Sequence, residues 1–144
     1  MAATAWSIYN LAKKKIGNGT IQLGVNTLKM QLHTSASNAS TFTLSTAASV
    51  TGEVASGSGY TTGGATLASV VWTVGASAKQ YKLDCADPVW TATGGNIADI
   101  KFAVIKNSAG QAICWSRLTT AQFTLTSANT LTVQINASGL FTLV

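Results

Sequence analysis

The side chains that could take part in acid, base, nucleophilic or metal chemistry are few in this chain of 144 residues. It holds four carboxylates, one histidine and two cysteines, against nine lysines and arginines. Three of the four acids, Asp84, Asp87 and Asp99, fall between Leu83 and Asn107. Any chemistry that depends on carboxylates would therefore centre on that stretch.

Catalysis needs such groups to converge on one substrate. Asp84 and Asp87 are three residues apart, which on a β-strand places them on opposite faces. A nucleophilic Cys85 or Cys114 would need His33 to be brought from a distant strand, and no serine lies in a Gly-x-Ser-x-Gly turn. The sequence therefore predicts that the protein is not an enzyme, has no catalytic residues and binds no cofactor.

Metal binding is the other chemistry that these residues suggest. Asn96 and the three acids flank one loop, and oxygen ligands suit Ca²⁺, but their spacing matches no EF-hand loop. The alternative is that these groups cap strand ends and accept hydrogen bonds from turn amides. His33 is the only histidine, and we expect it to be an ordinary exposed side chain. We therefore predict no metal site.

The two cysteines lie on separate predicted strands and lack the Cys-x-x-Cys spacing of zinc and redox motifs. A disulfide between Cys85 and Cys114 would require neighbouring strands with Cβ atoms about 4 Å apart. Buried and reduced thiols are favoured, because a free cysteine behaves as a small hydrophobic side chain.

Short β-strands must position all of these groups. Residues 82–87 alternate with period two until Pro88, which lacks a backbone donor, ends the ladder. Gly94 and Gly95 provide a turn before a half-buried strand that begins near Ile100. A turn at residues 107–110 then joins this strand to residues 112–118 as a hairpin.

The rest of the chain repeats this pattern of short apolar runs and turn residues. Further strands are predicted at residues 20–23, 27–33, 65–74, 77–87, 122–125, 130–135 and 140–144. About eight to ten short strands, with turn signals every eight to twelve residues, predict a single all-β domain built as an antiparallel β-sandwich.

Two segments depart from the pattern. Residues 5–16 fit a short helix or an extended arm, and we expect residues 1–19 to form an N-terminal arm. Residues 34–64 are rich in Ser, Thr and Gly, with strand fragments only at Phe42–Leu44 and Val50–Val54. Because long loops in compact domains are usually functional or partly disordered, we expect this to be the least structured segment and a candidate for contact between subunits.

Charge is scarce and local. Charged residues make up 9% of the chain, and Lys13, Lys14 and Lys15 supply three of its five net positive charges. A nucleic-acid binder would show a broader basic face with interleaved aromatics, so the cluster is either a solvated turn or a contact for an acidic partner. No run of eighteen apolar residues and no signal peptide are present, which predicts no membrane partner and folding in a cytoplasm.

Two of the four tryptophans are candidates for contact with a partner. Trp72 and Trp115 lie on predicted strands and are expected in the core, whereas Trp6 and Trp90 either contact a partner or cover an end of the sandwich. The candidate interface residues are Trp6, Ile8, Leu11, Lys13, Lys14, Lys15 and Trp90. In the arm, apolar burial would provide affinity and the lysines would steer, so that deleting residues 2–12 should abolish attachment without unfolding the domain.

Three blocks of sequence carry a family resemblance: DPVWTATGG followed by an AVI strand, GYTTGG at residues 59–64, and GTIQLGVNTLKMQL near the start. Together they resemble a group of small virion proteins of tailed bacteriophages. The resemblance implies a virion structural protein, made in the bacterial host cytoplasm, that decorates or cements the capsid by binding the major capsid protein or another virion protein. The alternative is a tail, fibre or connector component, including a carbohydrate- or surface-binding module. We expect a homo-oligomer, a trimer in preference to a dimer, because capsid lattices offer threefold positions.

Overall fold

The computed structural model describes residues 5–44 and 46–144, which form an all-β domain with one α-helix, α1 (Asn10–Gly17), and one 3-10 turn, η1 (Ala47–Ser49). Every strand pairing is antiparallel. The strands are β1 (Ser7–Ile8), β2 (Leu28–Thr34), β3 (Ala65–Thr66), β4 (Val71–Val74), β5 (Tyr81–Asp84), β6 (Val89–Thr91), β7 (Ile97–Asn107), β8 (Ala112–Arg117), β9 (Phe123–Leu125), β10 (Thr130–Thr132) and β11 (Phe141–Leu143). The prediction of an all-β, sandwich-like domain is confirmed.

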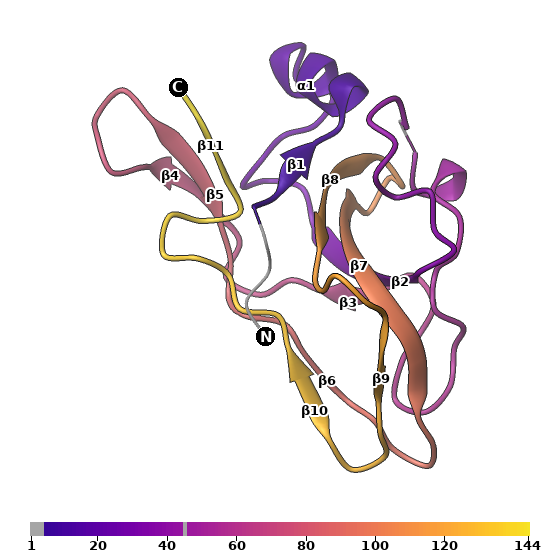
Figure 1. The fold of residues 1–144 in the computed structure, drawn as a ribbon. Helices are drawn as coiled ribbons and strands as arrows, with labels where there is room; N and C mark the ends of the chain where they lie inside the picture. Colours follow the sequence, from indigo (N-terminus) through magenta and orange to yellow (C-terminus); the bar gives the residue numbers. More distant parts are fainter. Residues whose placement is uncertain (1–4, 45) are drawn as a thin grey trace.

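The largest sheet has six strands in the order β1-β8-β7-β2-β3, with β9 paired to the first half of β7 (Figure 1). The predicted hairpin between β7 and β8 is confirmed. Its turn is closed by Asn107, whose Oδ1 accepts a hydrogen bond from the backbone of Gln111 at 2.9 Å. Asn107 Nδ2 also donates to Gln111 Oε1 at 3.0 Å, so this side chain fixes the register at the end of β7.

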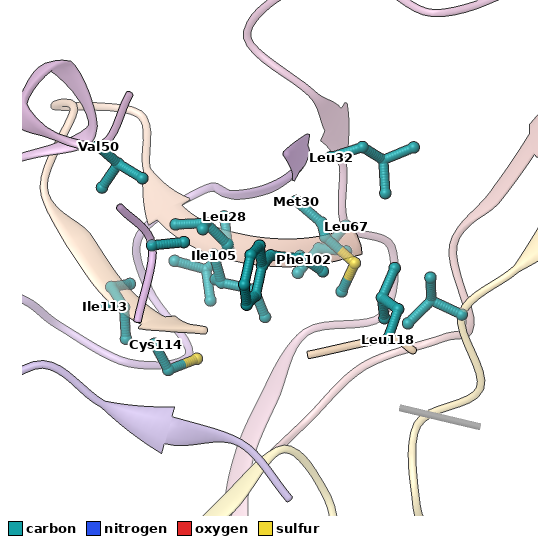
Figure 2. Close-up of a cluster of buried hydrophobic side chains, with 14 of the residues drawn as sticks. Leu28, Met30, Leu32, Val50, Leu67, Phe102, Ile105, Ile113, Cys114 and Leu118 are labelled. Carbon is teal, nitrogen blue, oxygen red and sulfur yellow. The ribbon is translucent and has the colours of Figure 1, made fainter. Parts of the chain in front are cut away.

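One face of this sheet forms the main core. The strand register aligns Met30, Ile105 and Cys114 in one row across β2, β7 and β8, and all three are fully buried. Figure 2 shows these side chains packed with Leu28 and Leu67. Full burial of one large aliphatic side chain contributes about 1.5–3 kcal/mol, so this row is a main source of stability.

His33 was expected to be an ordinary exposed side chain, and this expectation is wrong. It lies on the face of β2 opposite Met30 and is fully buried, with Ser37 and Thr51 beside its ring. Its Nδ1 lies 3.1 Å from the carbonyl oxygen of Thr51 and 3.3 Å from Ser37 Oγ. Burial lowers the pKa of His33, which favours the neutral ring with Nδ1–H donating to Thr51.

Between β2 and β3 the described residues form one 3-10 turn and isolated bridges but no strand, as expected of the least structured segment, yet hydrogen bonds hold much of it in place; Ser45 lies outside the described residues. Glu53 organises the segment: its Oε1 accepts hydrogen bonds from Tyr60 Oη at 2.8 Å and Gly63 N at 2.6 Å. Its Oε2 accepts one from Gln31 Nε2 at 2.7 Å. Neither expected strand fragment forms a strand, because these contacts and one isolated pairing of Glu53 with His33 replace a ladder.

The C-terminal residues 128–143 run antiparallel to residues 81–92. This pairing forms a three-stranded ribbon, β11-β5-β4, and a two-stranded one, β10-β6. Pro88 divides the ladder between them, as expected from its missing donor, but its carbonyl still accepts a hydrogen bond from Val133 N at 3.0 Å. Figure 1 shows the three-stranded ribbon on the side of the molecule opposite residues 34–64.

One predicted helix and two predicted strands have different outcomes in the structure. The predicted helix forms, as α1. No strand forms at residues 20–23, where Ile21 is instead buried and its N–H bonds to Lys15 O at 2.9 Å. The predicted strand at residues 65–74 is split into β3 and β4, because Ser69 adopts φ 53°, in the left-handed region that interrupts an extended strand.

Candidate functional site

The oxygen-bearing side chains of residues 84–99 serve local structure. Asp84 pairs with Lys82 at 2.9 Å and accepts a hydrogen bond from Cys85 N at 2.9 Å. Asp87 accepts one from Ile135 N at 2.8 Å, which holds the C-terminal segment against it. This is the turn-amide role that the sequence offered as the alternative to calcium binding. In residues 5–44 and 46–144, no three His, Cys, Asp or Glu side chains gather in a group that could hold a metal ion.

The two thiols are free, with Cys114 fully buried in the core and Cys85 half-buried. Burial raises the pKa of the Cys114 thiol well above its usual value. Burial, together with the nearby Asp84 and Asp87 charges, raises the pKa of Cys85 to about 12. Because the thiolate is the nucleophile, neither cysteine is poised for catalysis at neutral pH.

We expect both thiols of the native protein to react with a thiol reagent at pH 8 at least about 100-fold more slowly than in the unfolded chain, because so little thiolate is present. Cys85 should react first, since it is the less buried of the two. Stopped-flow absorbance with a chromogenic disulfide reagent measures both rates. An unfolded, unreduced chain without two reactive thiols would show a disulfide and contradict this assignment.

The N-terminal segment is held by the rest of the chain and is not a free arm over residues 5–19; residues 1–4 of the predicted arm lie outside the described part. Tyr9 is fully buried, with its hydroxyl donating to Ala39 O at 2.6 Å and its N–H to Ile113 O at 3.0 Å. Ala12, on α1, is 1% exposed. Deleting residues 2–12 would therefore remove part of the core, which corrects the expectation that the domain would be unaffected.

A groove of about 660 Å³ lies between this anchored segment and β11. Three of the predicted interface residues, Trp6, Ile8 and Lys13, line one side of it. Residues 138–142, which lead into β11 and form it, line the other. Both β1 and β11 are edge strands of their sheets, so two unpaired strand edges border one groove (Figure 1).

The edge of β1 directs backbone groups outward at Ile8. Hydrogen-bonded and non-hydrogen-bonded residue pairs alternate along an antiparallel ladder. Since Tyr9 N–H bonds to Ile113 O, the pair formed by Ile8 and Cys114 is a non-hydrogen-bonded one. The N–H and C=O of Ile8 therefore point away from β8, and no partner for them exists within the described part of the chain.

The edge of β11 also directs backbone groups outward, at Thr142. The bond from Gly75 N to Gln80 O, at 2.8 Å, sets the alternation between β4 and β5, so that Lys82 directs its backbone groups toward β4. Thr142 is paired opposite Lys82 and therefore directs its own N–H and C=O away from β5. Each wall of the groove thus offers one free backbone donor and one free acceptor.

An exposed apolar row adjoins the groove. Val74, Tyr81 and Leu143 are aligned across β4, β5 and β11 and are 47%, 46% and 38% exposed. Two residues further along each strand, on the same face, lie the buried Leu83 and Phe141 and the half-buried Trp72. The apolar face of the ribbon therefore continues from the core out to its free end, which projects from the six-stranded sheet (Figure 1). The period-two alternation of apolar residues predicts an apolar face on these strands, but it does not show which end of that face is exposed to solvent.

The other candidate residues do not join the groove. Leu11 is 38% exposed on α1, where Lys14 is also exposed and Lys15 half-buried. Trp90 is only 5% exposed, which corrects its assignment as an exposed interface residue. The residues after Pro88 form β6, which pairs Trp90 with Leu131, so the ring lies in the core.

The chain was compared with family models, curated proteins and solved structures, and none of these comparisons gave a match. No helix in the described ranges has the length and apolar character needed to cross a membrane.

Proposed function

We propose that this protein is a structural component of a tailed-phage virion that decorates or cements the capsid by non-catalytic protein–protein binding. The observation that carries the proposal is the exposed apolar row of Val74, Tyr81 and Leu143 at the free end of the ribbon. Large apolar side chains in one row, on an element that projects from the body, are suited to burial against another protein. The sequence resemblance to small virion proteins supports the identity of that partner as the major capsid protein or another virion protein.

The surroundings of the apolar row favour binding over chemistry. Interface centres are depleted in charge and enriched in aromatic residues, and Tyr81 has only Lys82 and Asp84 as charged neighbours on β5. Those two side chains already form an ion pair with each other. Burial of the row therefore need not separate these two charges from each other, which would otherwise oppose binding.

A second candidate function is a carbohydrate- or surface-binding module of a tail, fibre or connector. It is favoured by Tyr81, which is 46% exposed beside Trp72, with their ring centroids 5.8 Å apart. Sugar rings pack their C–H faces against such aromatic rings. Decoration remains the leading proposal because the apolar row extends over three strands, an area that suits a protein surface.

Counting copies in purified virions separates these functions. Hundreds of copies, with density on the shell in electron micrographs, would support decoration; a dozen or fewer would support a fibre or connector. A tail-tube protein would also be abundant, but its density would lie along the tail. Our proposal includes a homotrimer, so native mass spectrometry of the free protein should show three chains. Absence of the protein from the particles would refute the proposal.

We expect replacement of Val74, Tyr81 and Leu143 by serine to weaken attachment to particles by at least about 100-fold, since each buried apolar side chain contributes about 1.5–3 kcal/mol. The triple variant should unfold at a lower temperature than the parent, because more than half of each side chain is covered in the free protein. Circular dichroism at the binding temperature therefore checks that it is folded. Val89→Ser is the matched control: Val89 is 53% exposed on β6, away from the ribbon end. Parental attachment by the triple variant would move the interface elsewhere.

A further inference from the structure

We propose that the groove between β1 and β11 receives an extended, acidic segment of a different virion protein, which adds to these strands as a new β-strand. This inference rests on the proposed function and names the kind of partner segment that the attachment surface takes. It is carried by three features of the groove: outward backbone groups on both walls, apolar side chains within a mixed lining, and the Lys13 ammonium group.

The backbone groups select for an extended chain. Ile8 on one wall and Thr142 on the other each direct an N–H and a C=O outward, in the alternation of an antiparallel ladder. A strand laid along either edge would satisfy these groups with its own backbone, which is the basis of strand addition at exposed sheet edges. A helix offers no such groups, because its backbone donors and acceptors are bonded internally.

The side chains around the groove indicate which residues the segment carries. Trp6, Ile8 and Phe141 provide apolar surface for alternate side chains of an added strand. Among the described residues that line the groove, Lys13 is the charged one, and no carboxylate lies beside it there. Lys82 pairs with Asp84 on β5, so that carboxylate is already engaged and Lys13 is available to an acidic side chain of the partner. Lys14 and Lys15 add to the positive potential beside the groove.

A second copy of this chain does not match that chemistry. It has only four acids, and three of them, Glu53, Asp84 and Asp87, already accept hydrogen bonds from their own chain. The fourth, Asp99, lies at an irregularity within β7, which is paired on both sides. No free acidic strand is available from another copy, so charge complementarity points to a different protein.

Thr142→Pro tests the backbone pairing directly. Proline removes the N–H that points into the groove, and this donor takes no part in the ladder with β5. With particles assembled without the protein, we expect this variant to attach at least about 10-fold more weakly than the parent. Thr142→Val, which keeps the N–H, should attach within about twofold of the parent. Amide hydrogen exchange of Tyr81 and Leu83 checks that the ribbon remains formed.

Ile8→Pro and Lys13→Glu test the other wall and the charge. Ile8→Pro removes the corresponding outward N–H from β1, with Ile8→Val as its control. It provides a second test of the backbone pairing in case Thr142→Pro disrupts the ribbon. Lys13→Glu should weaken attachment about 10-fold and Lys13→Gln less, with the difference disappearing in high salt. Attachment of both proline variants at the parental level would overturn the proposal, while loss of attachment by the serine triple variant would leave the proposed function standing.

A photo-crosslinking residue at position 142 identifies the occupant in intact particles. We expect a crosslink to an acidic, extended segment of another virion protein, and no crosslink from the same residue placed at position 124 on β9. A crosslink from position 142 to a second copy of this chain would overturn the choice of partner. A parent protein that does not attach to particles at all would instead refute the proposed function.

Discussion

Replacing Glu53 by alanine is expected to lower the free energy of unfolding by about 3–5 kcal/mol, a large part of the stability of a domain of this size. The carboxylate accepts three hydrogen bonds, from Tyr60, Gly63 and Gln31, at 2.6–2.8 Å. Tyr60 and Gln31 are only 2% and 3% exposed, so their donors would be left unsatisfied away from water. Hydrogen bonds to charged groups are worth about 1.5–3 kcal/mol, and their losses are not fully additive.

Urea unfolding followed by tryptophan fluorescence measures this effect, with ellipticity as a second probe. Glu53→Gln keeps the shape and one acceptor, and should lose about half as much. Asp99→Asn is the surface control, because the Asp99 side chain is exposed and accepts a long hydrogen bond, 3.5 Å, from Gln122 Nε2. Asparagine also tolerates the backbone φ of 58° at this position. It should change stability by less than about 0.5 kcal/mol. A Glu53→Ala variant as stable as Asp99→Asn would show that residues 34–64 are not organised by this carboxylate.

Replacing Tyr9 by alanine is expected to cost about 3–5 kcal/mol of unfolding free energy, the range observed for large aromatic side chains removed from a core. Tyr9 is fully buried, and its hydroxyl reaches Ala39 while its backbone joins Ile113. The substitution should also release β1 from β8, so that the amide hydrogens of Ser7 and residue 9, which face β8, exchange faster than those of β2. Hydrogen exchange followed by mass spectrometry resolves the two regions.

Two variants separate the contributions of Tyr9. Tyr9→Phe removes only the hydroxyl and should cost about 1–2 kcal/mol, because the carbonyl oxygen of Ala39 loses its buried donor. Leu11→Ala, on the exposed side of α1, should cost less than about 1 kcal/mol. If Tyr9→Ala is no more destabilising than Leu11→Ala, the N-terminal segment behaves as the free arm that the sequence suggested.

The substitutions of Tyr9 also affect the groove. Trp6 and Ile8 keep their places only while Tyr9 holds β1 against β8, so a variant that detaches this segment loses one wall of the binding site. Weakened attachment by Tyr9→Ala would therefore be an indirect effect. For this reason the test of the groove uses Thr142, which lies on the opposite wall and does not contribute to the core.

The alternation of apolar residues and the turn chemistry determined most of the strands from the sequence alone. The hairpin of β7 and β8, the strand β2, and the C-terminal strands β9, β10 and β11 all follow from period-two patterns bounded by Gly, Asn and Ser. These signals are local, because each strand buries one face and each turn needs particular backbone angles. The lack of charge likewise followed directly from composition.

The tertiary structure alone decided which polar residues are buried and which apolar residues are uncovered. His33 and Gln31 lie on a face that alternation marks as polar, but His33 is buried beside Ser37 and Thr51, and Glu53 provides a partner for Gln31. Periodicity describes a strand and cannot show what a distant segment places over it. A segment rich in Ser and Thr, with one carboxylate, reads as a loop even when it is packed.

The candidate site was predicted in part for the same reason. Trp6, Ile8 and Lys13 were singled out by their types and their nearness in sequence, and they do line one groove. Their opposite wall, at Thr142, comes from the far end of the chain, and only the pairing of β11 with β5 brings it there. Trp90 was a candidate contact residue, but pairing with β10 buries it, whereas the ribbon carries Tyr81, which the sequence did not single out, beyond the core. Exposure depends on contacts between residues distant in sequence, which local patterns do not encode.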